Sequence, residues 1–141
     1  MQNRYEVFTT LINSINRSIR RIKNDAMKDY NLKSHHVSCL YYLYKKGSLT
    51  PTELTDLCDE DKAAISRSLD FLEKNEYIIR PKNKKHYNCK IILTEKGNEI
   101  GEYITKKIDS ILYNVDELIL EENRAIFYET LMLIENSLKN Q

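Results

Sequence analysis

The 141-residue sequence contains little glycine and proline, few cysteines and no tryptophan. Three Gly and two Pro residues leave few positions for sharp turns, which favours a mostly helical fold. The three cysteines, Cys39, Cys58 and Cys89, are odd in number and far apart, so they are not typical of a disulfide framework. We expect them to be buried, reduced thiols.

A long apolar segment is also missing. The longest stretch without a charged residue covers residues 34–44, and a membrane helix needs about 20 predominantly apolar residues. The first ten residues do not show the basic-then-apolar order of a secretory signal. We therefore expect no membrane association and a cytoplasmic location. The composition, 41% hydrophobic and 30% charged, is ordinary for a folded domain, and the length fits a single one spanning residues 1–141.

The net charge of +1 conceals two regions of opposite sign. Residues 1–94 contain 17 Lys and Arg against 11 Asp and Glu, a net charge of +6. Residues 95–141 contain 5 against 10, a net charge of −5. One part of the molecule is thus suited to a polyanion, although a solvated helix face often has the same composition.

Apolar residues recur every three or four positions in both terminal regions, which predicts long amphipathic helices. One covers residues 5–30, and two more follow Thr94, a good helix cap. These helices carry more apolar surface than the short central region can cover. A second copy of the chain would bury the remainder in a two-fold dimer. We therefore interpret residues 1–30 and 95–141 as dimerisation helices.

Three shorter helices are predicted between them. The first runs from residue 34 to residue 45, with Val37, Leu40, Leu43 and Tyr44 inward, and ends before Gly47. Thr50-Pro51-Thr52-Glu53 is a strong start for the second, with Thr50 as N-cap and Glu53 completing a capping box. It ends near Cys58. Asp61 is a suitable N-cap for the third, which runs to about Lys74.

The period then changes from helical to alternating. Residues 77–79 and 88–93 are predicted to form two strands. The segment that joins them is basic, and residues 80–90 contain no Asp or Glu. The fold class is therefore mainly α, a winged helix-turn-helix unit (residues 34–94) with a two-stranded wing and long terminal dimerisation helices.

In a helix-turn-helix the second helix enters the major groove of DNA. Here its inward side carries Ile65, Leu69 and Leu72, and its outer side begins with small residues. Arg67 can bind guanine O6 and N7 with its planar fork. Asp70 would repel phosphate, so we expect it at the rim of the groove or holding Arg67. A basic wing binds phosphates or enters the minor groove. The candidate DNA-binding residues are Thr50, Thr52, Lys62, Ala63, Ser66, Arg67, Arg80, Lys82, Lys84, Lys85 and His86.

The run LTPTELTDLCDEDKAAISRSLDFLEKNEYIIR, followed by LTEKG at residues 93–97, resembles the MarR family of transcription regulators. The shared features are the Ile65-Ser66-Arg67 triplet, the turn after the recognition helix and the Leu-Thr-x-x-Gly start of a dimerisation helix. The resemblance is close over residues 34–100. It implies a homodimeric regulator, expected to be a repressor, that binds a pseudo-palindromic operator and responds to a small molecule or an oxidant.

Two positions depart from the family pattern. The wing usually carries Asp-Arg-Arg, and the aligned residues here are 85–87, Lys-His-Tyr. Lys84, Lys85 or His86 would therefore replace the arginine that reads the minor groove. The glycine that normally follows the recognition helix is Glu76. Because Asn75 tolerates the left-handed conformation, the turn is expected to shift by one residue.

Other interpretations of single residues are weaker. Cys58 precedes Asp59-Glu60-Asp61, which should raise its pKa and lower its reactivity, so a thiol-based redox sensor stays an alternative only. His35-His36 suggests zinc, but His86 is the single further histidine and the helix after Thr94 contains no His or Cys, so we expect no metal and no cofactor.

The aromatic residues suggest a ligand without identifying it. Six of the ten tyrosines lie on helices that are expected to adjoin one another and could line a pocket for a small aromatic or lipophilic effector: Tyr5, Tyr30, Tyr41, Tyr42, Tyr44 and Tyr103. The ordinary role of such residues is to fill the core and the dimer seam. No nucleophile–base pair or phosphate loop indicates an enzyme. A winged protein-interaction module that does not read DNA is the remaining alternative.

Overall fold

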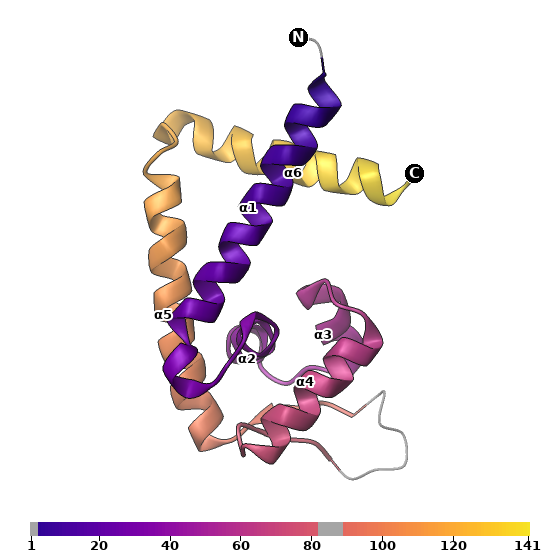
Figure 1. Ribbon diagram of the computed structural model, residues 1–141, viewed down its shortest axis with the longest axis vertical. Helices are drawn as coiled ribbons and strands as arrows, with labels where there is room; N and C mark the ends of the chain where they lie inside the picture. The colour runs from indigo at the N-terminus through magenta and orange to yellow at the C-terminus, as the bar shows by residue number, and fades with distance from the viewer. Residues whose placement is uncertain (1–2, 82–88) are drawn as a thin grey trace. The chain divides into compact units, whose positions relative to one another are not determined.

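The computed structural model describes residues 3–81 and 89–141 (Figure 1). The helices are α1 (Arg4–Ala26), the 3-10 turn η1 (Lys28–Tyr30), α2 (Ser34–Lys46), α3 (Pro51–Cys58), α4 (Lys62–Lys74), α5 (Glu95–Asp116) and α6 (Glu121–Lys139). The strands are β1 (Ile78–Ile79) and β2 (Ile92–Leu93). The chain forms two compact units, one up to Lys106 and one from Lys107 onward. No helix in the described residues is both long enough and apolar enough to cross a membrane.

Helix α2 is the centre of the first unit, where it contacts α1, α3, α4 and β2. The predicted inward residues Val37, Leu40 and Leu43 are at most 2% exposed, so that prediction is confirmed. Tyr44 was also predicted to point inward, and it is 37% exposed. Its side chain lies against Gly101 of α5 instead of entering the core.

The predicted start signals of α3 and α4 are both confirmed. Thr50 Oγ1 accepts a hydrogen bond from the Glu53 amide at 3.2 Å, and Glu53 Oε2 accepts one from the Thr50 amide at 3.3 Å. At α4, Asp61 Oδ1 accepts from the Ala64 amide at 2.7 Å. A cap of this kind satisfies amides that have no partner inside the helix, which contributes about 1 kcal/mol each.

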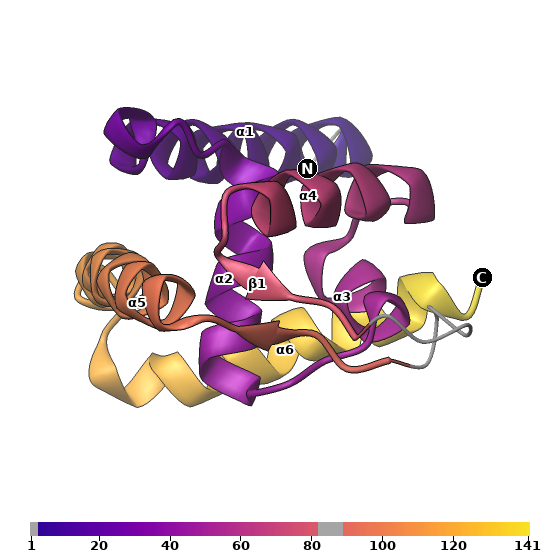
Figure 2. The same cartoon turned by 90° about the horizontal axis from the view of Figure 1, so that it is seen from below.

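The two strands form an antiparallel pair, with Ile78 opposite Leu93 and Ile79 opposite Ile92 (Figure 2). A single bridge joins Leu49 to Ile91. The second strand was expected from residue 88, which lies outside the described residues, and its regular part begins only at Ile92. Ile91 forms backbone hydrogen bonds with Leu49, the residue before the Thr50 cap of α3. The hairpin is therefore also attached to the start of α3.

The predicted shift in the turn after α4 is wrong, because Glu76 itself adopts the left-handed conformation, with φ 62°. The Tyr77 amide donates to Leu72 O at 2.9 Å and closes the helix end. Thr94 Oγ1 donates to Glu76 O at 2.6 Å, and Lys96 Nζ donates to Asn75 O at 2.7 Å. These bonds hold the turn where a non-glycine residue would otherwise be strained.

His36 connects α2 to α4. Its ring stacks on Phe71, with ring centroids 4.1 Å apart, and its Nδ1 accepts a hydrogen bond from the Lys33 amide at 3.0 Å. Burial, with the neighbouring His35 and Lys33, lowers the pKa of His36 to about 4. The ring is therefore neutral at neutral pH and acts as a packing and capping residue.

Replacement of Gly97 by alanine should destabilise the protein, since a Cβ there would lie 2.0 Å from the carbonyl oxygen of Tyr77. Overpacking against backbone costs up to about 3 kcal/mol. Gly101→Ala is the matched control, because its Cβ meets only the Tyr44 side chain, from 3.0 Å, and alanine gains about 1 kcal/mol of helix propensity. Urea unfolding measures both. Equal stability of the two variants would contradict the close approach of residue 97 to the Tyr77 carbonyl.

Acidification should destabilise the fold through His36. Because its folded pKa of about 4 lies below the ordinary 6.5, the unfolded chain binds more protons between these values, and stability falls as pH decreases from 6.5 to 4. The loss is at most ~3 kcal/mol. Urea unfolding at several pH values should show a weaker dependence for His36→Gln than for His35→Gln. An unchanged slope in His36→Gln would show that other groups cause the loss.

Candidate nucleic-acid interface

Helices α3 and α4 form the predicted helix-turn-helix. They are joined at Asp59-Glu60-Asp61, and Asp59 adopts the left-handed conformation, with φ 51°, at the end of α3. On α4 the inward side chains Ile65, Leu69 and Leu72 are at most 1% exposed. The predicted outer residues Lys62, Ala63, Ser66 and Arg67 are all exposed. The burial of one face therefore fixes which residues α4 presents to a partner.

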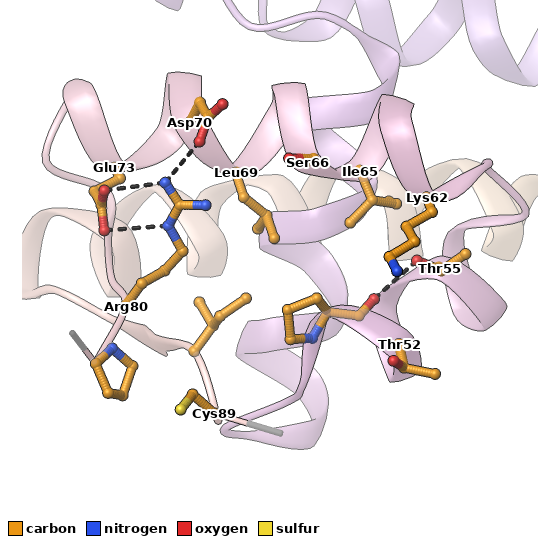
Figure 3. A pocket seen from close by; sticks show the side chains of 13 residues that line it. Thr52, Thr55, Lys62, Ile65, Ser66, Leu69, Asp70, Glu73, Arg80 and Cys89 are labelled. Carbon is orange, nitrogen blue, oxygen red and sulfur yellow. Dashed lines mark hydrogen bonds and ion pairs between the residues drawn. The ribbon is translucent and has the colours of Figure 1, made fainter. Parts of the chain in front are cut away.

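A concave pocket of about 740 Å³ lies beside this outer face (Figure 3). Residues of α3, α4 and the two ends of the hairpin line it. Four of the predicted DNA-binding residues meet there, namely Thr52, Lys62, Ser66 and Arg80. Its wall is mixed, because Ile65, Leu69 and Ile91 add apolar surface. No tyrosine among the described residues lines this pocket, so the six tyrosines of the predicted aromatic cluster are not part of it.

Arg80 is bound to two carboxylates of α4. Its Nη2 lies 2.7 Å from Asp70 Oδ1 and 3.0 Å from Glu73 Oε1, and its Nε donates to Glu73 Oε2 at 3.2 Å (Figure 3). The hydrogen bonds to Glu73 and Asp70 raise the pKa of Arg80 above its ordinary value. Asp70 was expected at the rim of the groove or holding Arg67, and its ion-pair partner is Arg80. Arg80 therefore joins the base of the hairpin to α4.

Arg67 differs from Arg80. Its side chain is exposed, and it makes no hydrogen bond or ion pair with another residue of the described part of the chain. Arg67 adjoins Ser66 on the outer face of α4. The Asp61 cap fixes where this helix begins and therefore where both residues lie along it. Thr50 has a different task, because its side chain caps α3. Lys82, Lys84, Lys85 and His86 lie outside the described residues.

Metal ligands do not gather anywhere in residues 3–81 and 89–141, where no group of three or more His, Cys, Asp or Glu side chains is suited to an ion. The rings of His35 and His36 lie 4.2 Å apart, and burial lowers the pKa of both. Of the tyrosines, Tyr30 and Tyr103 approach each other with ring centroids 6.1 Å apart, and Tyr41 packs edge-on against Tyr42.

One cluster was missed by reasoning from the sequence. The thiols of Cys39 in α2 and Cys58 in α3 are hydrogen-bonded to each other, and Lys23 of α1 lies close enough to act on Cys58. The acidic turn was expected to raise the pKa of Cys58. The pKa is instead lowered, because the hydrogen bond from Cys39 and the charge of Lys23 outweigh burial and Glu60. The inward position of Cys39 beside Leu40 was the only signal in the sequence.

Comparisons with known proteins find similar sequences and similar solved structures. The family model described as MarR family matches residues 32–85. An uncharacterised helix-turn-helix transcriptional regulator of Bacillus cereus is 29% identical over 125 residues, covering 87% of this chain and 82% of the relative. A second one, YwoH of Bacillus subtilis, is 27% identical over 101 residues, covering 70% and 74%.

Two of the similar solved structures contain DNA. MepR of S. aureus in a DNA complex has a TM-score of 0.80 at 20% identity, covering 93% of this chain and 97% of MepR. A putative MarR family regulator from Listeria monocytogenes, complexed with a 26mer DNA, has a TM-score of 0.83 at 22% identity, with 94% and 89% covered. At these identities the structures show the winged helix-turn-helix fold. The family model matches the central unit, residues 32–85, and the curated relatives are described as helix-turn-helix transcriptional regulators, so the chain is similar to MarR family regulators in sequence and in fold.

Proposed function

We propose that this protein binds double-stranded DNA sequence-specifically as a homodimer and acts as a repressor on a pseudo-palindromic operator. The observation that carries the proposal is the outer face of α4. There Arg67 is exposed and makes no bond to the described residues, beside the small side chains Ala63 and Ser66. A helix with little bulk at its start can approach base edges closely, and an arginine fork can read guanine. MepR and the Listeria relative are each similar in fold and were solved with DNA.

Charge supports the same assignment. The two carboxylates of α4 that would repel phosphate, Asp70 and Glu73, are both paired with Arg80. Of the predicted wing cations, Lys82, Lys84 and Lys85 supply phosphate contacts in this proposal, from their place in the sequence. A small effector that occupied the pocket beside Lys62 and Ser66 would compete with DNA, because the same side chains line both surfaces.

The dimer is supported by the apolar stripe on α1. No residue of this helix is buried, and Phe8, Leu11, Ile12, Ile15 and Ile19 are 39–57% exposed. Burying a fully exposed apolar side chain of this size gains about 1.5–3 kcal/mol, and these side chains are about half exposed, so a partner surface would gain roughly half of that for each of them. The partner proposed is a second copy of this chain, which would set two recognition helices at a fixed separation of roughly 34 Å, one turn of DNA.

Arg67→Ala should lower affinity for the specific operator by roughly 1–3 kcal/mol and affinity for random DNA much less, if its fork reads a base. Replacement of Lys84 and Lys85 by Ala is the contrasting variant, because it also removes positive charge but should weaken binding to both DNAs alike. It should reduce the salt slope by about one unit per lost phosphate contact. Binding isotherms on both DNAs at three salt concentrations measure these differences.

The outcomes separate the alternatives. Equal loss on both DNAs in Arg67→Ala would make Arg67 a phosphate contact and leave Ser66, Lys62 or DNA shape as the source of specificity. If neither variant changes binding, the helix-turn-helix is not a DNA-binding surface. The protein-interaction module would then be the better interpretation.

The wild-type protein should sediment at micromolar concentration with twice the 16.7 kDa chain mass. Ile15→Lys places a charge in the apolar stripe, where Ile15 is 55% exposed, and should shift the protein towards a single chain, since an unpaired charge is costly to bury. Asn13→Lys adds the same charge to an exposed position of α1 outside the stripe and should leave the mass unchanged. A folded wild-type monomer would contradict the dimer.

A further inference from the structure

The end of helix α4 is bonded directly to the start of α5. Thr94 acts twice, because its Oγ1 donates to Glu76 O at 2.6 Å and its amide donates to Tyr77 O at 3.0 Å. Lys96 Nζ donates to Asn75 O at 2.7 Å. We call these three hydrogen bonds the α4–α5 joint. All of them run from the first residues of α5, or the residue before it, to the turn that ends α4.

Lys96 occupies a position that does not favour its own helix. It stands in the first turn of α5, and a helix N-terminus already carries a partial positive charge. Its ammonium lies instead at the C-terminal end of α4, where the last carbonyl groups carry a partial negative charge. The ammonium is also 4.3 Å from the centre of the Tyr77 ring, within the range of a cation–π contact. The charge of Lys96 therefore stabilises the end of α4.

The Thr94 hydroxyl serves both helices at once. It accepts a hydrogen bond from the Gly97 amide at 3.0 Å, which caps the start of α5, while it donates to Glu76 O. Gly97 lets the two backbones approach this closely, since a Cβ there would lie 2.0 Å from Tyr77 O. The joint is therefore short and closely packed, and one segment cannot slide along the other without breaking its bonds.

The joint links two helices that are otherwise anchored at different places. The main neighbours of α4 are α2, α3 and β1. Helix α5 is attached to α2 at another point, where Gly101 lies against Tyr44, and its Ile104 is buried. The bonds of Thr94 and Lys96 connect α4 and α5 to each other directly. They therefore act on the angle between these two helices.

We propose that the α4–α5 joint, with Lys96 as its positioning residue, holds the recognition helix at a fixed angle to α5 and thereby selects the spacing of the two operator half-sites. This inference rests on the proposed function, in which a dimer presents two copies of α4 to DNA. Each base pair inserted between the half-sites moves them about 3.4 Å apart and rotates one by roughly a tenth of a turn. To follow that change α4 must move against α5, and the joint resists the movement.

The test uses DNA that the wild-type protein selects from random duplexes, and copies of it with one or two base pairs added or removed at the centre. The wild type should bind the altered copies much more weakly than the selected DNA. Lys96→Met keeps an unbranched side chain and loses the ammonium, so it should reduce this ratio of affinities roughly tenfold, as expected for loss of one hydrogen bond to a charged group. Lys96→Arg retains a cation of similar reach and should restore the ratio.

Two controls separate positioning from stability. Lys106→Met removes the same charge from α5 at an exposed position, where Lys106 pairs with Glu102, and should keep the wild-type ratio. Val37→Ala destabilises the core of α2, which forms no part of the joint, and should also keep the ratio. A joint that only stabilised the fold would make Lys96→Met and Val37→Ala alike in this measurement.

The outcomes distinguish this inference from the proposed function. Equal discrimination between spacings in the wild type and Lys96→Met overturns the inference, as does an equal loss of discrimination in Val37→Ala. If the wild type selects no DNA, the proposed function fails and the spacing claim fails with it.

The joint is then decided without DNA, from the distance between nitroxide residues placed at Ala63, an exposed position of α4, in the two chains of a dimer. Pulsed electron paramagnetic resonance should show a broader distribution of this distance in Lys96→Met than in the wild type or Lys106→Met. Equal widths in all three proteins would refute a joint that fixes α4.

Discussion

The burial of α2 is the constraint on which the first unit depends. This helix has apolar residues on several sides, and α1, α3, α4 and β2 each cover part of it. The positions of α3 and α4 follow from the surfaces that α2 offers them, including the stacking of His36 on Phe71. Because the inner face of α4 is used in this contact, its outer face is defined at the same time. The exposed outer face of α4 and the core are therefore two sides of one packing arrangement.

Much of this arrangement could be predicted from local signals. The capping residues Thr50 and Asp61 defined the starts of α3 and α4, because a cap depends on residues three positions apart. The inward face of α4 followed from the spacing of Ile65, Leu69 and Leu72, and these residues are buried. Both signals are contained within one helix, so no knowledge of tertiary contacts was needed.

The features that could not be predicted depend on contacts between distant segments. Arg80 was counted as a DNA-binding cation, and its partners Asp70 and Glu73 lie on another element. The reactivity of Cys58 was judged from the adjacent acidic residues, whereas Cys39 and Lys23, on α2 and α1, decide the direction of its pKa. Glu76 keeps its left-handed conformation because Thr94, far along the chain, donates to its carbonyl. Residues that are adjacent in the sequence do not reveal contacts of this kind.

The Arg80 ion pairs also reduce the positive charge that the hairpin can offer to a polyanion such as DNA. Arg80, in the described part of that basic run, is bonded to two carboxylates of its own chain, and its side chain is only 27% exposed. A protein displaces the cations condensed on DNA when its own positive charges take their place at the phosphates. Each such replacement adds about 0.9 to the slope of log affinity against log salt concentration. A cation already neutralised within the protein replaces none. In the proposed DNA complex Arg80 therefore releases no ion, and fewer ions are released than the lysines and arginines of the hairpin sequence would suggest.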